Sequence, residues 1–280
     1  METIETVPNM RALASRLRSM KGGLSLVPTM GALHSGHEAL IKAAVAAGGH
    51  VVVSIFVNPL SFGASENFAG YPRSREADLA LCKKLGVAAV FLPAPEEIYP
   101  RGFSTYVTEE AISKKLCGVS RPTHFRGVAT LAAKLLNIIG PDRLFVGQKD
   151  AQHAAVLRKV TADLNYTVEI VVVPTVREPD GLAVAVKNSE LTPVQRQESL
   201  AISAALRKAV EMVESGVRST DRLVAEATHI LGKNNRVRVI YAQIVDSSTM
   251  EPIREVVPGK TLMCIAAWVS EVRLTDNAVL

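Results

Sequence analysis

The sequence predicts an α/β fold, a doubly wound parallel sheet followed by a smaller C-terminal α+β domain. Strand-like and helix-like stretches alternate five times before residue 177, and the alternation then stops. The stretch 50–57 is almost continuously apolar and rich in valine, which is typical of a parallel strand covered on both faces. In such a sheet ligands bind at the carboxyl ends of the strands, so a functional site is expected there.

The elements of the first part follow one another in a regular order. Apolar runs closed by Gly or Pro predict strands, and apolar residues three or four positions apart predict helices. The expected elements are a helix over 7–21, a strand over 24–27, a helix over 38–47, a strand over 50–57, a loop over 58–73, a helix over 74–86, a strand over 87–92, short elements over 104–107 (strand) and 109–116 (helix), a helix of about four turns ending at Ile139, a strand over 144–146, a helix over 151–164 and a strand over 168–173.

The C-terminal part has a different pattern. Two helices are expected over 193–215 and 219–231, and strands near 236–245, 261–269 and 271–276 follow them. Gly, Pro and Ser between these strands fit hairpin connections. We therefore divide the chain into a first domain over 1–176 and a second domain over 177–280.

Composition and charge are those of a globular enzyme that acts on small anions. Of the 280 residues, 48% are hydrophobic and 21% are charged, and the formal net charge is +5. Basic runs interleaved with aromatic residues are missing, which disfavours nucleic acid, and no apolar run is long enough to span a membrane. Three widely spaced cysteines indicate free thiols, and the acidic N-terminus lacks the apolar core of a signal peptide. We therefore expect a cytoplasmic enzyme.

A turn between a strand and a helix carries the strongest local signal. His34, Gly36 and His37 lie between the apolar run 24–27 and the helical stretch 38–44. A helix start presents unpaired N–H groups and a positive dipole end, and glycine lets a phosphate approach the backbone. The two imidazoles can supply donors to charge that develops on phosphoryl oxygens. The turn therefore predicts an anion-binding site.

Two other interpretations of the histidine pair are open. Turn histidines also occur without any ligand, and two histidines three residues apart at a helix start can share a zinc ion. No cysteine or acidic cluster nearby completes a zinc shell. We therefore expect no protein-bound metal at this turn.

Further motifs follow in a fixed order along the chain. They are 27–37, Phe-Val-Asn-Pro at 56–59, Tyr-Pro-Arg at 71–73, Arg-Pro-Thr-His-Phe-Arg-Gly-Val at 121–128, Pro-Asp-Arg at 141–143, Gly-x-Lys-Asp-x-Gln at 147–152, Val-Pro-Thr-Val-Arg-Glu-x-Asp-Gly-Leu-Ala at 173–183, and Asp-Asn at 276–277. His-x-Gly-His is shared by nucleotide-binding α/β enzymes that form or cleave acyl- and nucleotidyl-phosphates. With the other motifs, nearly the whole chain resembles the pantothenate synthetase family.

The resemblance implies a fold and a reaction. The first domain would be Rossmann-like and bind nucleotide, and the second would be a lid. The carboxylate of pantoate would attack the α-phosphate of ATP, assisted by Mg²⁺, to give an acyl-adenylate and pyrophosphate. The amine of β-alanine would then attack the activated carbonyl and release AMP, so catalysis rests on positioning and charge neutralisation. A homodimer is also implied, by the resemblance alone.

The resemblance also implies residue roles. His34 and His37 would contact phosphate oxygens, and Lys149 would neutralise the transferred phosphoryl group. The implied ATP-binding residues are Pro28, Met30, Gly147, Asp150, Val176 and Lys187. The implied substrate-binding residues are Asn58, Ser61, Tyr71 and His153.

Two pairs of residues within these motifs also have a structural interpretation. Lys149 and Asp150 could be a solvated pair at a helix start, although their place at a strand exit favours function. For Arg121 and His124, stabilisation of a loop by backbone hydrogen bonds remains as good an explanation as a role in binding.

Several positions depart from the family pattern. The family has glutamine at the positions of Ser61 and His153, where two amides hold the hydroxyl and carboxylate of pantoate. An unpaired substrate group there costs roughly 1–3 kcal/mol, enough to change the preferred acid. The family's Met-Ser-Ser-Arg-Asn is Val-Ala-Val-Lys-Asn at 184–188, so Lys187 keeps the charge but not the bidentate fork of arginine. Cys117 stands where the family has glutamate.

Three functions are consistent with these departures. The first is a pantothenate synthetase whose site has drifted, the second is a related ligase for another acid or amine, and the third is a nucleotide-binding protein without catalysis. Retention of His34, His37, Lys149 and Asp150 disfavours the third. Other His-x-Gly-His nucleotidyltransferases lack the 121–125 and 173–178 blocks, and the remaining length holds no anticodon-reading domain for a tRNA ligase.

Overall fold

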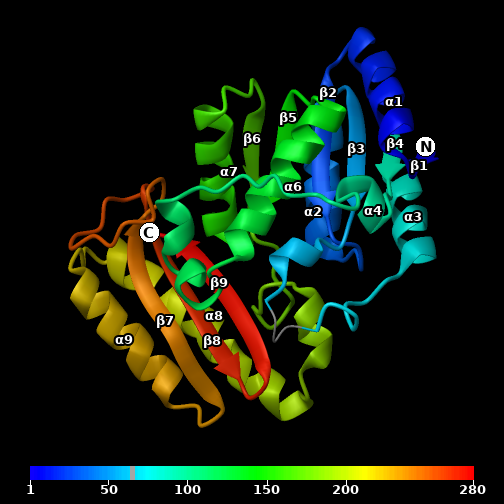
Figure 1. Cartoon of the computed structure of the whole chain (residues 1–280). Helices are drawn as coiled ribbons and strands as arrows, with labels where there is room; N and C mark the ends of the chain where they lie inside the picture. Colours follow the sequence, from blue (N-terminus) through cyan, green and yellow to red (C-terminus); the bar gives the residue numbers. More distant parts are fainter. Residues whose placement is uncertain (64–66) are drawn as a thin grey trace.

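The computed structural model describes residues 1–63 and 67–280; of the predicted loop 58–73, residues 64–66 therefore lie outside the described part. Six described strands form one parallel sheet in the order β1-β4-β3-β2-β5-β6 (Figure 1). Their bounds are β1 Glu2–Ile4, β2 Leu24–Thr29, β3 His50–Ile55, β4 Ala89–Phe91, β5 Arg143–Gly147 and β6 Glu169–Val173. The predicted parallel sheet is confirmed, including the parallel pairing of β3 with both of its neighbours.

Helices connect the parallel strands and cover both faces of the sheet (Figure 1). Their bounds are α1 Val7–Ser19, α2 Ser35–Ala46, α3 Arg75–Lys84, α4 Pro95–Ile98, α5 Cys117–Ser120, α6 His124–Ile139 and α7 Ala151–Asp163, with 3-10 turns η1 Pro59–Ser61, η2 Ile112–Lys114 and η3 Gln148–Asp150. Alternation along β2 separates the faces: Leu26 belongs to the cluster under α1, α6 and α7, and Val27 to the cluster under α2 and α3. This is the doubly wound arrangement that the sequence predicts.

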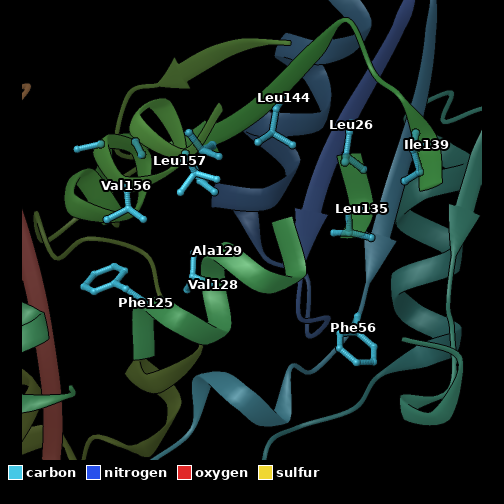
Figure 2. Packing of buried hydrophobic residues seen from close by; sticks show 14 of the residues in the cluster. Leu26, Phe56, Phe125, Val128, Ala129, Leu135, Ile139, Leu144, Val156 and Leu157 are labelled. Atoms are coloured by element: carbon cyan, nitrogen blue, oxygen red, sulfur yellow. The ribbon is translucent and has the colours of Figure 1, made fainter. Parts of the chain in front are cut away.

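The core cluster that contains Leu26 lies between the sheet and α6. Its side chains come mainly from the strands β2, β4 and β5 and from the helices α1, α6 and α7. Figure 2 shows Leu26, Phe56, Phe125, Val128, Ala129, Leu135, Ile139, Leu144, Val156 and Leu157. This cluster fixes α6 and α7 against the sheet. Both helices start at the carboxyl edge of the sheet.

A three-stranded antiparallel sheet follows the parallel one, in the order β7-β8-β9 (Figure 1). It consists of β7 Val237–Asp246, β8 Thr261–Val269 and β9 Val272–Val279, preceded by η4 Val186–Glu190, α8 Pro193–Glu214 and α9 Thr220–Gly232. One face packs on α8 and α9, whereas Leu262 and Cys264 join the core of the first sheet. The antiparallel sheet therefore closes over the carboxyl edge of the parallel sheet.

Several details differ from the sequence prediction, and three of them have a clear physical reason. The edge strand β1 was not expected, because three residues carry too little pattern to indicate a strand. The strand expected over 104–107 does not form: this extended segment crosses α6, and the Val107 N–H donates to the Thr130 hydroxyl instead of to a strand. The helix expected over 109–116 is only the turn η2, because the Glu109 carboxylate captures the N–H groups of residues 111–113. No helix in the described ranges has the length and apolar character to cross a bilayer.

Candidate functional site

A cavity of about 1420 Å³ lies where the parallel strands end and the antiparallel sheet covers them. Its wall comes from the exits of β2, β3, β5 and β6, from the starts of α6 and α7, and from β8 and β9. Every site residue expected from the sequence lines it. These residues are Pro28, Met30, His34, His37, Asn58, Ser61, Tyr71, Gly147, Lys149, Asp150, His153, Val176 and Lys187.

The two histidines of the turn cap α2 in a reciprocal way. His34 is the N-cap residue, and its Nδ1 accepts a hydrogen bond from the Gly36 N–H at 3.1 Å. The His34 N–H in turn donates to Nδ1 of His37 at 3.3 Å. The two rings lie 4.1 Å apart, centroid to centroid. Serine or threonine with glutamate usually makes such a capping box, and here two imidazoles make it.

This geometry determines the protonation of both rings. Because each Nδ1 accepts from a backbone N–H, each neutral ring carries its proton on Nε2. Burial lowers the pKa of His37 to about 3, with a further contribution from His34. Burial, followed by the charge of Lys149, also lowers the pKa of His34. Both side chains are thus neutral donors at pH 7, held in place by the helix that they cap.

The backbone before the histidines is held by a carboxylate that the sequence did not single out. Asp78 of α3 is 2% exposed, and its two oxygens accept from the Ala32 N–H (3.0 Å) and the Leu33 N–H (2.9 Å). Ala32 has a positive φ of 51°, and the preceding Gly31 has 83°. These left-handed residues bend the chain from β2 into α2, and Asp78 stabilises the bend. Asp78 is distant from this bend along the chain, so no local pattern reveals it.

Lys149 and Asp150 form the exit of β5, and β9 holds them there. The Asn277 amide donates to the carbonyl oxygens of Gln148 and Lys149, both at 2.9 Å, and accepts from the Gln148 amide at 2.8 Å. The Lys149 ammonium lies 3.6 Å from the Asp150 carboxylate and 3.5 Å from the Thr275 hydroxyl. The second sheet thus fixes the backbone that presents the cationic side chain.

Asp150 is ionised in the cavity. Desolvation there opposes its charge, but the Lys149 ammonium and the His153 and His124 imidazoles hold the pKa of its carboxyl below the usual value. Its side chain is 62% exposed, so it is open to a ligand. Gly147 lies one residue before η3, and a Cβ added there meets nothing within 4 Å. The surface beside Asp150 therefore has room for a ligand to lie against the backbone.

A second contact from β9 fixes the segment after β6. Asp276 is 5% exposed and pairs with Arg177 through both guanidinium nitrogens, at 2.7 and 3.2 Å. The Val176 carbonyl accepts from the Val184 N–H at 3.0 Å, which folds residues 177–183 back on themselves. Lys187 follows in η4, exposed and on the cavity wall. The Arg177–Asp276 pair was not predicted as part of the site.

At the other end of the cavity, Asn58 supports Ser61. The Asn58 amide nitrogen donates to the Ser61 hydroxyl (2.8 Å) and to the Gly127 carbonyl (2.9 Å). Its oxygen accepts from the Leu60 N–H (3.1 Å) and the Tyr99 hydroxyl (2.9 Å). Asn58 is 2% exposed and all its usual hydrogen-bonding positions are occupied, so a direct substrate contact from its side chain stays a prediction.

The carbonyl of Ser61 receives two further donors. Arg121 Nη2 donates to it at 3.0 Å and His124 Nδ1 at 2.9 Å. These bonds are the loop-stabilising interaction that the sequence left open for Arg121 and His124. Gly127 permits the close approach of α6, because a Cβ there would lie 2.3 Å from the Leu60 carbonyl oxygen. The Ser61 turn is therefore rigid, and its side chain is short.

Two more side chains complete this end of the cavity. Tyr71 packs edge-on against Phe62, and burial, with the charges of Asp78 and Asp150, raises its pKa to about 12, so its phenol stays a neutral donor. His153 lies on the first turn of α7 and lines the cavity, and its ring makes no hydrogen bond to any residue in the described part of the chain. Burial lowers the pKa of His153, against the opposing charge of Asp150.

Cys117 lies at the junction of the two sheets. Its N–H donates to the Gln152 amide oxygen at 3.0 Å, its sulfur lies 3.0 Å from the Tyr241 hydroxyl, and Arg273 Nη2 donates to the sulfur at 3.4 Å. The Gln152 amide nitrogen in turn donates to the carbonyls of Ile112 and Lys115. Here the thiol makes a contact between the domains.

Fold and site together define a class of protein. A doubly wound parallel sheet carries, at its carboxyl edge, a helix start capped by neutral histidines and a lysine on the neighbouring strand exit, and this arrangement is that of a nucleotide-binding α/β enzyme acting on phosphates. No cluster of three or more His, Cys, Asp or Glu suited to a metal occurs among residues 1–63 and 67–280.

Comparisons with known proteins identify the family. The family model for pantoate-beta-alanine ligase matches residues 2–279. Curated pantothenate synthetases from Thermotoga neapolitana and Moorella thermoacetica are 45% and 43% identical over 280 residues, covering all of this chain and 100% and 99% of theirs. A crystal structure of pantothenate synthetase from Thermus thermophilus superposes with a TM-score of 0.94 at 38% identity, covering 100% of this chain and 99% of that one. The chain belongs to the pantoate-beta-alanine ligase family.

A more distant relative has a title that names ligands. The pantoate-beta-alanine ligase from Francisella tularensis, described as complexed with beta-gamma ATP and beta-alanine, matches with a TM-score of 0.78 at 28% identity over 100% of this chain and 97% of its own. The fold class and the family expected from the sequence are thus confirmed, and the non-catalytic and alternative-substrate interpretations are not favoured.

Proposed function

We propose that this protein is an ATP-dependent, AMP-forming ligase that joins pantoate to β-alanine through an acyl-adenylate. The observation that carries the proposal is the conjunction of full-length family membership with one cavity holding two neutral histidine donors and Lys149. The pantoate carboxylate attacks the α-phosphorus, the bond to the pyrophosphate oxygen breaks, and pyrophosphate leaves. The Nε2–H groups of His34 and His37 stabilise charge on the phosphoryl oxygens, and Lys149 neutralises it.

The remaining residues bind the rest of the nucleotide. We assign the ribose hydroxyls to Asp150, with Gly147 beneath, because this carboxylate is ionised and open in the cavity. The backbone of Val176 lies at the adenine edge, with Pro28 and Met30 along the same wall. Lys187 supplies a second cation for the phosphates from η4, as a point charge rather than a guanidinium fork.

Mg²⁺ belongs to the same proposal as a partner of the nucleotide. Magnesium is usually held by one or two carboxylates together with substrate phosphates, and it retains several waters. Asp150 is assigned to the ribose, and the described residues hold no three-residue His, Cys, Asp or Glu cluster, so they fit a metal that arrives on the triphosphate better than a protein cage. Bound there, Mg²⁺ would add positive charge at the phosphate oxygens.

We also propose that pantoate binds at Ser61, His153 and Tyr71, where the rigid Ser61 turn forms one side of the place.

We further propose that the two domains meet between residues 176 and 177, that the protein is cytoplasmic, and that it forms a homodimer. Sedimentation velocity tests the last point: a dimer is expected at micromolar concentration, and a monomer there removes it.

The overall reaction tests the function. Purified protein with ATP, Mg²⁺, pantoate and β-alanine should release AMP and pyrophosphate in amounts equal to the amide formed. Replacing pantoate by other small hydroxy acids and β-alanine by other amines is the matched control. If AMP release follows another acid and amine while pantoate with β-alanine gives none, the substrate assignment is wrong.

A further inference from the structure

Four polar residues that follow β6 have no role in the proposed function. Glu178 and Asp180 belong to the sequence motif at 173–183, Asn188 lies in η4, and Arg196 lies near the start of α8. Arg196 Nη2 donates to Glu178 at 2.5 Å and to Asp180 at 2.7 Å, and its Nε donates to Asp180 at 2.9 Å. These ion pairs attach the segment after β6 to α8.

The other oxygen of the Glu178 carboxylate binds the side chain of Asn188. The Asn188 amide nitrogen donates to this oxygen at 2.6 Å and to the Ala183 carbonyl at 2.9 Å. A turned-over amide would set its oxygen against two acceptors, so the nitrogen faces them. The Asn188 amide oxygen is buried and has no hydrogen-bond partner in the described part of the chain. The charge-assisted bond to Glu178 therefore outweighs the cost of one unpaired buried acceptor.

The fixed Asn188 side chain also fixes the direction of its neighbour Lys187. Both residues lie in the single 3-10 turn η4, where neighbouring side chains point about 120° apart. The two acceptors of the Asn188 amide, Glu178 and Ala183, lie outside η4, so they prevent the turn from rotating about its own axis. With Asn188 held in this way, Lys187 is exposed and lies on the cavity wall.

We propose that Glu178 is a positioning residue for Lys187: through Asn188 it holds η4 in the orientation from which the Lys187 ammonium meets the phosphates of ATP. The inference rests on the proposed function, which assigns Lys187 to the phosphates. Glu178 is not among the described residues that line the cavity, so it acts from behind the wall. Arg196 in turn holds the Glu178 carboxylate in place.

The chemistry of lysine makes this support necessary. An arginine fork at this position would add its own geometric selectivity for phosphate, whereas Lys187 carries a point charge on a flexible stem. The location of the charge therefore depends on how firmly the backbone of η4 is held. Glu178 also acts on the phosphate end as a charge: burial and Lys149 lower the pKa of His34, and the charges of Asp150 and Glu178 oppose this. The experiment must separate these two effects.

Equilibrium binding of ATP and of adenosine to Glu178→Ala tests the proposal. Adenosine has no phosphate, so its Kd should change by less than about twofold, whereas the Kd for ATP should rise about tenfold. Retained adenosine binding also shows that the variant is folded. Asn188→Ala breaks the same link from the other side, and the same result is expected from it. The control is Glu198→Ala, which removes a carboxylate of α8 that pairs with Arg236 and should change neither Kd.

A double-mutant cycle separates the position of Lys187 from the charge on His34. If Glu178 acts through Lys187, its removal has no further effect once Lys187 is gone. In the Lys187→Ala protein, Glu178→Ala should therefore change both the Kd for ATP and pantoate-dependent pyrophosphate exchange by less than about twofold. An effect of the Glu178 charge on His34 would instead persist in full in that protein.

Three results would overturn the positioning role of Glu178 and leave the ligase function in place. They are an unchanged Kd for ATP in Glu178→Ala, equal losses of ATP and adenosine binding, and a full effect of Glu178→Ala in the Lys187→Ala protein. If the unaltered protein binds ATP but shows no pantoate-dependent exchange, the proposed function fails. The ATP and adenosine affinities of the variants would still decide whether Glu178 positions Lys187.

Discussion

The two ends of the cavity are built in different ways. At the end that we assign to the phosphates (the phosphate end), the cap of α2 fixes the imidazoles of His34 and His37, and Asn277 of β9 holds the backbone of Lys149. At the end that we assign to the acid (the acid end), the Ser61 backbone is held by two hydrogen bonds, whereas the Ser61 side chain is short and the His153 ring has no hydrogen-bond partner among the described residues. We therefore expect the phosphate end to be preorganised for the charge that a nucleotide reaction develops, and the acid end to carry the selectivity.

The largest expected effect comes from removing a phosphate donor. His34→Ala should lower pantoate-dependent pyrophosphate exchange at least about 100-fold, because a preorganised donor is lost. It should also reduce the free energy of unfolding by about 1 kcal/mol, since His34 caps α2. His34→Asn is the matched variant: its side-chain oxygen can keep the cap but cannot reach the phosphate, so only exchange should fall. Retained exchange with a collapsed melting temperature would show the histidine to be structural.

Asp78→Ala should also lower activity at the phosphate end, because it releases the backbone that positions His34. It leaves the N–H groups of Ala32 and Leu33 without their acceptor in a buried bend, so the free energy of unfolding should fall by about 3 kcal/mol. Exchange should drop about tenfold or more as His34 loses its position. Glu76→Ala removes an exposed carboxylate from the same helix and is the control. A loss of activity no larger than that of the control would mean that the bend holds without Asp78.

Substitutions at the acid end should raise activity, whereas those at the phosphate end lower it. Replacing Ser61 and His153 together by glutamine should raise kcat/KM for pantoate in the exchange reaction at least tenfold, about 1.4 kcal/mol of transition-state binding. The physical reason is reach: Ser61 is short and its hydroxyl oxygen already accepts from the Asn58 amide, whereas a longer glutamine amide can meet the substrate. If the parent protein already uses pantoate efficiently and the double variant behaves the same, the two positions carry no selectivity.

The last prediction concerns activity least and is a dependence of the free energy of unfolding on pH. In the folded protein the pKa of His37 is about 3, whereas it returns to about 6.5 on unfolding. The unfolded chain therefore binds the extra proton first, and the free energy of unfolding should decrease as the pH falls from about 6.5 towards 3. His37→Asn should reduce this slope. Denaturant unfolding at several pH values measures it, and an equal slope in both proteins would contradict the neutral, buried ring.

How much the sequence predicts also differs between the two ends. The turn at His34 and the exit at Lys149 are visible in the sequence because each depends on a local pattern, an apolar strand followed by Gly and a helix. Asp78, Asn277 and Asp276 are invisible to local reasoning, because each acts across a long stretch of chain. In the sequence, Asn277 and Asp276 stand out only as part of a family motif.

The short edge strand β1 shows the same limit in the fold. The strands β2, β3 and β5 have apolar runs that predict them, whereas β1 has three residues and forms only because β4 is there to pair with it. Local pattern thus predicts the layers and the position of the cavity. The contacts that hold the cavity's side chains come from tertiary structure.

Pantoate-dependent exchange of labelled pyrophosphate into ATP by the unaltered protein tests the central claim most directly. The account predicts exchange that requires pantoate and Mg²⁺, proceeds without β-alanine, and falls at least about 100-fold in both His34→Asn and His37→Asn. Exchange that does not require an acid, or that survives both substitutions, would contradict the assignment of the phosphate end.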